Sequence, residues 1–165
     1  MMKFNLSSRF FAAAAIALAG AAMAPSDAFA ATGATVNIGG TVTTTLNIVA
    51  TPDAGAATLD LSGGVKTPKV ATLAIDTNNS TGYTLTATNG DMVNGTATTP
   101  ISYLVSTVNA GGAAPTAFAA NYTYSSTAAN AAGAGGRDLY IQYTPAALQD
   151  PGTYAATITL AVTDN

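Results

Sequence analysis

The 165-residue chain contains no cysteine, no histidine and no tryptophan, and no glutamate occurs along it either. Without cysteine the chain can form neither a disulfide nor a thiolate metal site. Without histidine it lacks the commonest general base, the commonest metal ligand and the usual partner of a serine nucleophile. These absences argue against an enzyme, and we expect no catalytic residues, no metal site and no cofactor.

Charged side chains are scarce, since only 8% of the residues are Asp, Glu, Lys or Arg. From residue 31 onward, three basic and seven acidic side chains give a formal charge of −4. A chain with so few basic residues has no electrostatic footprint for nucleic acid or for an anionic membrane surface. We therefore expect neither of these partners.

The first 30 residues have the features of a secretory signal peptide. Lys3 and Arg9 precede an apolar run from Phe10 to Ala24, and residues 28–30 (Ala-Phe-Ala) match the small-residue cleavage signal. The run is shorter than the ~20 residues that a membrane-spanning helix needs, and no later stretch is apolar enough to span. We expect residues 1–30 to be removed. The remaining chain is expected to be exported, without a membrane segment, as a protein the size of one domain.

Runs of alternating apolar and polar residues dominate the rest of the chain, separated by gaps rich in Gly, Asn and Pro. A period of two is that of a half-buried strand. The pattern predicts an all-β fold, an immunoglobulin-like antiparallel sandwich of about six to eight strands. The expected elements are a strand at 58–61, a hairpin of 70–76 with 83–88, a strand at 101–108, a long loop at 109–136 with one weak strand near 121–125, a strand at 139–143 and a last strand at 153–162.

Three groups of side chains could suggest a ligand site. Residues 89–95 (NGDMVNG) could form a calcium loop, but Asn-Gly and Gly-Asp are ordinary turn residues and no glutamate closes the loop. Arg137 and Asp138 are expected to form an exposed pair beside a strand. The tyrosines could stack a sugar, but packing at sheet edges is the favoured role. These tyrosines are Tyr103, Tyr122, Tyr124, Tyr140 and Tyr143.

The longest alternating run covers residues 34–48, ATVNIGGTVTTTLNI. At ~3.3 Å per residue such a strand would be roughly 50 Å long, whereas strands usually have about 5–6 residues. The glycine pair in its middle suggests that the run consists of two pieces, an N-terminal arm and the first strand of a domain. We expect the arm to cover residues 31–42 and the domain residues 43–165. The apolar face of the arm consists of Ala34, Val36, Ile38, Gly40 and Val42.

A second alternating run lies at the other end of the sequence, at Tyr154, Ala156, Ile158, Leu160 and Val162. A sandwich that lacks one strand exposes unpaired backbone groups and uncovered core side chains. An extended arm from another molecule can fill such a groove through backbone hydrogen bonds and alternate side chains, the mode called donor-strand complementation. This contact is head-to-tail and does not close, so it produces a filament.

The run from Val36 to Val42 resembles the N-terminal extension of chaperone–usher pilins, where alternating apolar residues precede a glycine and one further hydrophobe. Gly152 is the fourteenth residue from the end of the sequence, counting Asn165, where these pilins carry a glycine before their final strand. Residues 151–162, 82–90 and 101–108 are similar to the archaic, spore-coat-U-like branch of that superfamily. The chain departs from the family in having no cysteine pair, and Asp164 stands where most members have a tyrosine.

The resemblance implies a structural subunit of an extracellular fibre, a fimbrium, that supports adhesion or biofilm formation. It also implies a homopolymer joined through the arm, assembly by a periplasmic chaperone and an outer-membrane usher, and a final location at the cell surface. The same last strand would pair first with the chaperone and then with the arm of the next subunit. Its groove residues would be Gly152, Tyr154, Ala156, Ile158, Leu160 and Val162.

A second interpretation remains open, because residues 34–48 could form one long strand with a glycine bulge that folds back on its own domain. The chain would then be a monomeric secreted β-sandwich, a binding module that recognises a glycan or a surface ligand through the loop at 109–136. The two interpretations differ in one feature. The fibre subunit needs a free or intermolecular arm, whereas the binding module needs residues 34–42 inside its own sheet.

Overall fold

The structure is a computed structural model that describes residues 35–95, 99–129 and 135–165. The chain divides into two units, one that ends at Gly40 and one that runs from Thr41 to Asn165, and each is described by itself. In the first unit, residues 35–40 form no strand or helix and their side chains are exposed. The expected signal peptide and Ala34 lie outside the described residues. The boundary expected between residues 42 and 43 stays a prediction.

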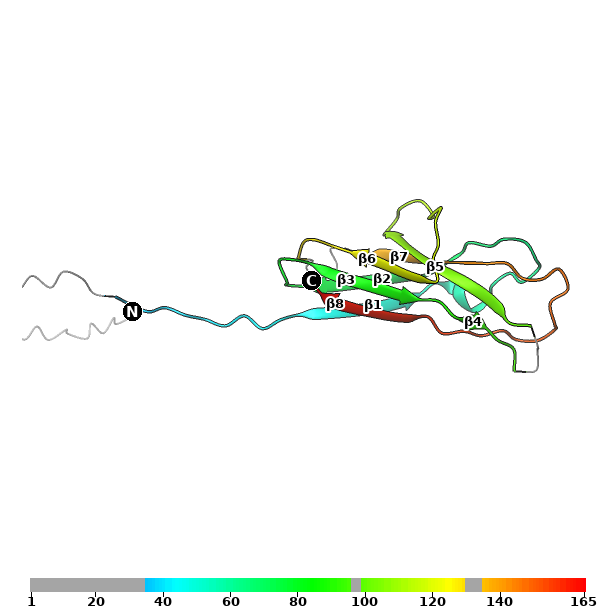
Figure 1. Cartoon of the computed structure of the whole chain (residues 1–165), viewed down its shortest axis with the longest axis horizontal. Helices are drawn as coiled ribbons and strands as arrows, with labels where there is room; N and C mark the ends of the chain where they lie inside the picture. The colour runs from blue at the N-terminus through cyan, green and yellow to red at the C-terminus, as the bar shows by residue number, and fades with distance from the viewer. Residues whose placement is uncertain (1–34, 96–98, 130–134) are drawn as a thin grey trace, which may run out of the picture. The chain divides into compact units, whose positions relative to one another are not determined.

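The second unit is built from strands, as the alternating runs predict (Figure 1). Two antiparallel sheets, one with the strand order β1-β2-β7-β5-β4 and one with the order β6-β3-β8, form a sandwich-like arrangement. A 3-10 helix, η1 (Ala54–Ala57), follows the first strand. The strands are β1 (Leu46–Pro52), β2 (Lys69–Thr77), β3 (Tyr83–Thr88), β4 (Asp91–Met92), β5 (Ile101–Asn109), β6 (Asn121–Ser125), β7 (Arg137–Tyr143) and β8 (Thr159–Asp164).

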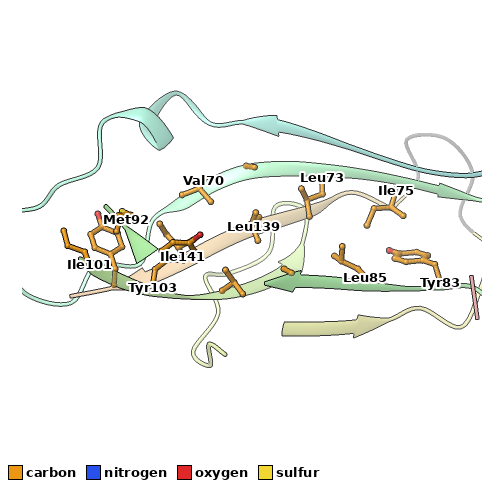
Figure 2. Close-up of a cluster of buried hydrophobic side chains, with 14 residues drawn as sticks. Val70, Leu73, Ile75, Tyr83, Leu85, Met92, Ile101, Tyr103, Leu139 and Ile141 are labelled. Carbon is orange, nitrogen blue, oxygen red and sulfur yellow. The ribbon is translucent and has the colours of Figure 1, made fainter. Parts of the chain in front are cut away.

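The core lies between the two sheets and follows from the period of two. In β3 the residues Tyr83, Leu85 and Ala87 are buried, whereas the threonines between them are half-exposed. Figure 2 shows this end of the core, where Leu73 and Ile75 from the other sheet also lie, and the opposite end with Met92 and Tyr103. Alternation therefore sorts the side chains of the central strands into an inner and an outer face.

The hairpin expected from residues 70–76 and 83–88 is wrong. Both runs are strands, but β2 pairs with β1 and β7, whereas β3 pairs with β6 and β8 in the other sheet. Residues 78–82 therefore carry the chain from one sheet to the other. Gly82 completes this corner with a φ of +87°, a conformation that favours glycine.

Two other expected strands are also corrected. Residues 58–61 form no strand but an irregular segment that follows η1, and Leu59 and Leu61 pack on the core from that segment. The last strand begins only at Thr159, because its partner β3 ends at Thr88, which pairs with Thr159. Residues 153–158 are therefore outside the ladder of the sheet, apart from one bridge between Ala155 and Val93.

Asn78 fastens the chain that leads into β1. Its side-chain Oδ1 accepts a hydrogen bond from the Thr45 amide at 2.8 Å, and its Nδ2 donates to the Thr43 carbonyl at 2.7 Å. The Asn78 amide in turn donates to the Thr45 carbonyl at 3.2 Å. Residues 43–45 are thus held at the end of β2, at the same end of the sandwich as Asp164, which accepts a hydrogen bond from the Thr77 hydroxyl.

Arg137 and Asp138 are not the exposed pair that the sequence predicts, because both are buried. The Arg137 guanidinium donates to the hydroxyl and the carbonyl of Thr107 and to Asn109, and it stacks 3.4 Å from the ring centroid of Tyr124. The Asp138 carboxylate accepts from the Gly111 amide and contacts the Lys69 ammonium at 3.1 Å. Both side chains are satisfied structural groups.

Candidate functional site

A groove of ≈ 740 Å³ opens between the two sheets along the segment that leads into β8. Buried core side chains line its floor, among them Met92, Tyr103 and Ile141. One wall consists of Ala50 and Pro52 of β1 with η1 and the irregular residues after it, and the other wall consists of residues 152–158 and Leu160. The groove therefore reaches the hydrophobic core from the surface.

The groove exists because β1 and β8 are both edge strands. In the described part of the chain, β1 pairs only with β2, and β8 pairs only with β3. The two edges run in opposite directions, since β1 begins beside Thr77 and β8 ends beside Tyr83, on either side of the 78–82 corner. Edge strands present unpaired N–H and C=O groups that can template another strand.

Burial along both edges is incomplete. In β1, Leu46 and Ile48 are half-buried, but every residue from Val49 to Pro52 is exposed. In β8 the inward residues, such as Leu160 and Val162, are only half-buried. The equivalent residues of the central strand β3 are fully buried, so the core lacks cover on the groove side.

Residues 152–158 are held in place at the mouth of the groove by their own contacts. The Tyr103 hydroxyl donates to the Thr157 carbonyl at 3.1 Å, and the Ala155 and Val93 backbones exchange two hydrogen bonds of 3.0 Å. Gly152, with a φ of +143°, lies against the Asn94 side chain, which donates to the Pro151 carbonyl. The groove wall at residues 152–158 is therefore held in position by hydrogen bonds to Tyr103 and Val93, and by that of Asn94 to the adjacent Pro151.

Gln149 fixes Tyr154 at the end of the groove. The Gln149 amide donates to the Tyr154 hydroxyl at 2.9 Å and to the Thr99 carbonyl at 2.8 Å, and its oxygen accepts from the Ala146 amide. The Tyr154 hydroxyl donates to the Asp150 carbonyl. All three hydrogen-bonding groups of the Gln149 side chain are used, which gives the Tyr154 ring a defined position.

The groove is uncharged, since none of the residues that line it is acidic or basic. Burial, with a smaller contribution from Asp91, raises the pKa of the Tyr103 phenol above its usual value, so this hydroxyl remains a neutral donor. Among the described residues, no cluster of three or more Asp, Glu, His or Cys side chains could hold a metal ion. The chemistry available is apolar contact and backbone hydrogen bonding.

The residues expected in the acceptor groove are brought together with one exception. Gly152, Tyr154, Ala156, Ile158 and Leu160 line the groove, whereas Val162 lies further along β8 and packs on the core. The sequence interpretation missed the whole opposite wall, from β1 and the segment after it. The alternation of Leu59 and Leu61 was the signal for part of that wall. The residues missed include Ala50, Pro52, Ala56, Leu59 and Leu61.

The expected donor side chains are among the most exposed large hydrophobic residues that the structure describes. Val36 is 83% exposed, Ile38 93% and Val42 86%. A Cβ atom built on Gly39 or Gly40 would meet no atom within 4 Å. Residues 35–45 belong to no strand.

Comparisons of the chain with protein families, with curated proteins and with solved structures find no match. No helix in the described ranges is both long enough and apolar enough to cross a membrane. The interpretation of the groove therefore depends on its own geometry.

Proposed function

We propose that the chain is the structural subunit of an extracellular fibre, and that it polymerises by inserting residues 34–42 of one copy into the groove of the next. The observation that carries this proposal is the uncharged groove, which is open to the core and bordered by two unpaired strand edges. Such a site fits an extended apolar segment, since a strand can pair with the free edge while alternate side chains enter the groove.

The arm and the groove match in length and in chemistry. The arm face at residues 34–42 covers nine positions, and the groove wall at residues 152–160 also covers nine. The arm carries Val36, Ile38 and Val42 and no charged residue. Burying each of these three side chains contributes ~1.5–3 kcal/mol, so the joint would be long-lived without a disulfide.

The position of residues 43–45 favours a second copy of the chain, rather than the chain's own arm, as the segment that fills the groove. Their hydrogen bonds to Asn78 place them at the end of β1 that lies away from Ala50 and Pro52, the groove residues of this strand. To enter its own groove, the arm would have to reverse direction within this fastened segment. An arm that instead enters a neighbour makes a head-to-tail contact, which extends into a filament.

The resemblance to chaperone–usher pilins supports the same function. It would make the chain a fimbrial subunit that is exported to the periplasm, handed over by a chaperone and an usher, and displayed at the cell surface in adhesion or biofilm formation. The monomeric binding module has less support, because it requires residues 34–42 within the sheet of their own domain and the described part of that segment, residues 35–42, forms no strand.

The test introduces one carboxylate on either face of the arm. Ile38→Asp places the charge on the apolar face, and Asn37→Asp places it on the polar face one residue away. Material from the cell surface is run on a gel in detergent, with and without boiling. We expect the wild type and Asn37→Asp to give a ladder of multimers that collapses only on boiling, and Ile38→Asp to give monomer in both lanes.

A monomer from the wild-type chain in both lanes would contradict the proposal. So would an undiminished ladder from Ile38→Asp, because the groove could not then be filled by this face of the arm.

A further inference from the structure

Three exposed apolar residues lie on segments at the end of the sandwich where the groove begins. Leu148 is 96% exposed, Val65 is 66% exposed and Val93 is 56% exposed. The loops of Leu148 and Val65 touch, since a Cβ built on Gly63 would lie 3.6 Å from the Ala147 Cα. Val93 pairs with Ala155, and the next residue, Asn94, lies against Gly152. We call these three residues the groove-end patch.

The polarity of the inserted arm decides what lies next to this patch. Every strand pair in the described part of the chain is antiparallel, and antiparallel pairing is slightly more stable per residue than parallel pairing. An arm that pairs antiparallel with the β8 edge ends, at Val42, beside Gly152. The domain that donates the arm then begins at the groove-end patch.

The chain between the arm and its domain is short and fastened. Only residues 43–45 separate Val42 from β1, a span of about 10 Å at ~3.3 Å per residue. These residues are held to Asn78 by the three hydrogen bonds described above. The corner at residues 78–82 must therefore lie close to the groove end of the copy that receives the arm.

We propose that the groove-end patch is a second contact between consecutive copies, packed against the corner end of the copy that donates the arm. The inference rests on the proposed function. The corner end consists of residues 43–45, 78–82 and 126–128, together with Asp164 and Asn165, which hydrogen-bond to Thr77, Thr81 and Ser126. Asp164 is the charged side chain at this end, and its carboxylate accepts the Thr77 hydroxyl. Ala128 and threonines at this end are exposed, so their methyl groups are available to the patch. The contact stiffens the joint beyond what the arm alone provides.

The test isolates one joint with two variants of the chain from residue 31. Ile38→Asp disables the arm and gives an acceptor. Ala156→Trp fills the groove at an exposed alanine and gives a donor. Mixed, the two form a dimer with one joint, and exchange of a labelled donor measures its dissociation rate. Leu148→Ser and Val65→Ser are then added to the acceptor, with Ala113→Ser as the control at an exposed position in the loop that follows β5.

We expect Leu148→Ser to release the whole donor about tenfold faster, with a smaller effect for Val65→Ser and none for Ala113→Ser. A synthetic peptide of residues 34–42 should leave all four acceptors at the same rate, because it carries the arm without the corner end. This peptide also shows that each variant acceptor is folded.

Three outcomes would overturn the inference. In the first, the donor leaves the Leu148→Ser acceptor at the wild-type rate. In the second, the peptide is released faster to the same degree as the donor, which would place Leu148 inside the groove. In the third, neither donor nor peptide binds the unmodified acceptor, and this result would overturn the proposed function as well.

Discussion

Arg137 is the residue whose environment departs furthest from what its charge suggests. Its guanidinium is buried, makes three hydrogen bonds to Thr107 and Asn109, and lies over the Tyr124 ring. The side chain thereby joins β7 to β5 and β6, which belong to different sheets. Charged residues are rarely buried, so the sequence alone favoured an exposed position.

The contrast between Arg137 and Lys66 tests this role. Arg137→Met removes charged hydrogen bonds inside the sandwich and leaves buried acceptors unpaired, so it should lower the free energy of unfolding by about 1.5–3 kcal/mol. Lys66→Met removes the partner of Asp60 in a more exposed ion pair, where solvent screening makes the expected loss much smaller. Urea unfolding at pH 7 measures both. Equal losses would show that Arg137 contributes no more than a surface charge.

Asp138 makes part of the stability depend on pH. The hydrogen bond from the Gly111 amide, with the Lys69 ammonium, lowers the pKa of this carboxyl below its usual value. A carboxyl with a lowered pKa stabilises the fold above its unfolded pKa of about 3.9, and this contribution is lost as the pH falls through the folded value.

Asp138→Asn should therefore be less stable than the wild type at pH 7, by about 1–3 kcal/mol, and the difference should shrink below about pH 4. Urea unfolding between pH 2 and pH 7 provides the measurement. Asp150→Asn, at an exposed loop position, is the control and should stay within about 0.5 kcal/mol of the wild type. A difference that is constant over the whole pH range would mean that the charge of Asp138 has no stabilising role.

At the scale of the elements, the corner between β2 and β3 determines which sheet each strand joins. Gly82 and Gly64 both have positive φ angles, +87° and +76°. A Cβ on Gly82 would overlap the Ser126 carbonyl and lie 2.8 Å from the Ala128 nitrogen, whereas a Cβ on Gly64 would meet open space. Substitution at Gly64 therefore introduces backbone strain alone, whereas substitution at Gly82 introduces backbone strain and steric overlap together.

Gly64→Ala should cost about 1–2 kcal/mol, the strain of a left-handed residue with a Cβ. Gly82→Ala should cost a further 1–3 kcal/mol or so, because backbone atoms that cannot rotate away must shift. Thermal unfolding of the two variants compares them directly. If Gly64→Ala proves as damaging as Gly82→Ala, the corner does not depend on the close approach of Ser126.

The alternating runs were sufficient to predict the sandwich, because burial of one face imposes a period of two on each strand. They could not predict strand partners. Residues 70–76 and 83–88 have the pattern of a hairpin, and the residues between them would suit a hairpin turn as well as a corner. The groove could be predicted from the sequence only in part. The even-numbered residues from 154 to 160 were identified as groove residues. The wall from Ala50 and Pro52 was not, because it depends on which strands lie at the sheet edges, and contacts distant in sequence determine that.

At the scale of the whole molecule, the open groove should make the domain less stable alone than with an arm bound in the groove. The residues of β8 that face the core are only half-buried, and the end of β1 from Val49 to Pro52 is exposed, so a strand bound in the groove would cover more of both. The chain has no cysteine with which to compensate. Its stability should therefore depend on the arm of another copy.

Thermal unfolding of the Ile38→Asp chain with added arm peptide tests this dependence. A ligand that binds only the folded state stabilises it by about 2.7 kcal/mol at one hundred times its dissociation constant. For a domain of this size, that stabilisation should raise the melting temperature by about 10 °C. A peptide with Asn37→Asp should give nearly the same shift, because that side chain lies on the polar face.

A peptide with Ile38→Asp should give no shift, and neither peptide should act on the Ala156→Trp chain, whose groove is filled. The melting temperature of that chain should also exceed that of the Ile38→Asp chain without peptide, because the indole covers part of the core that is otherwise open. If the wild-type arm peptide leaves the melting temperature of the Ile38→Asp chain unchanged, the groove does not bind the arm, and the proposed polymerisation is wrong.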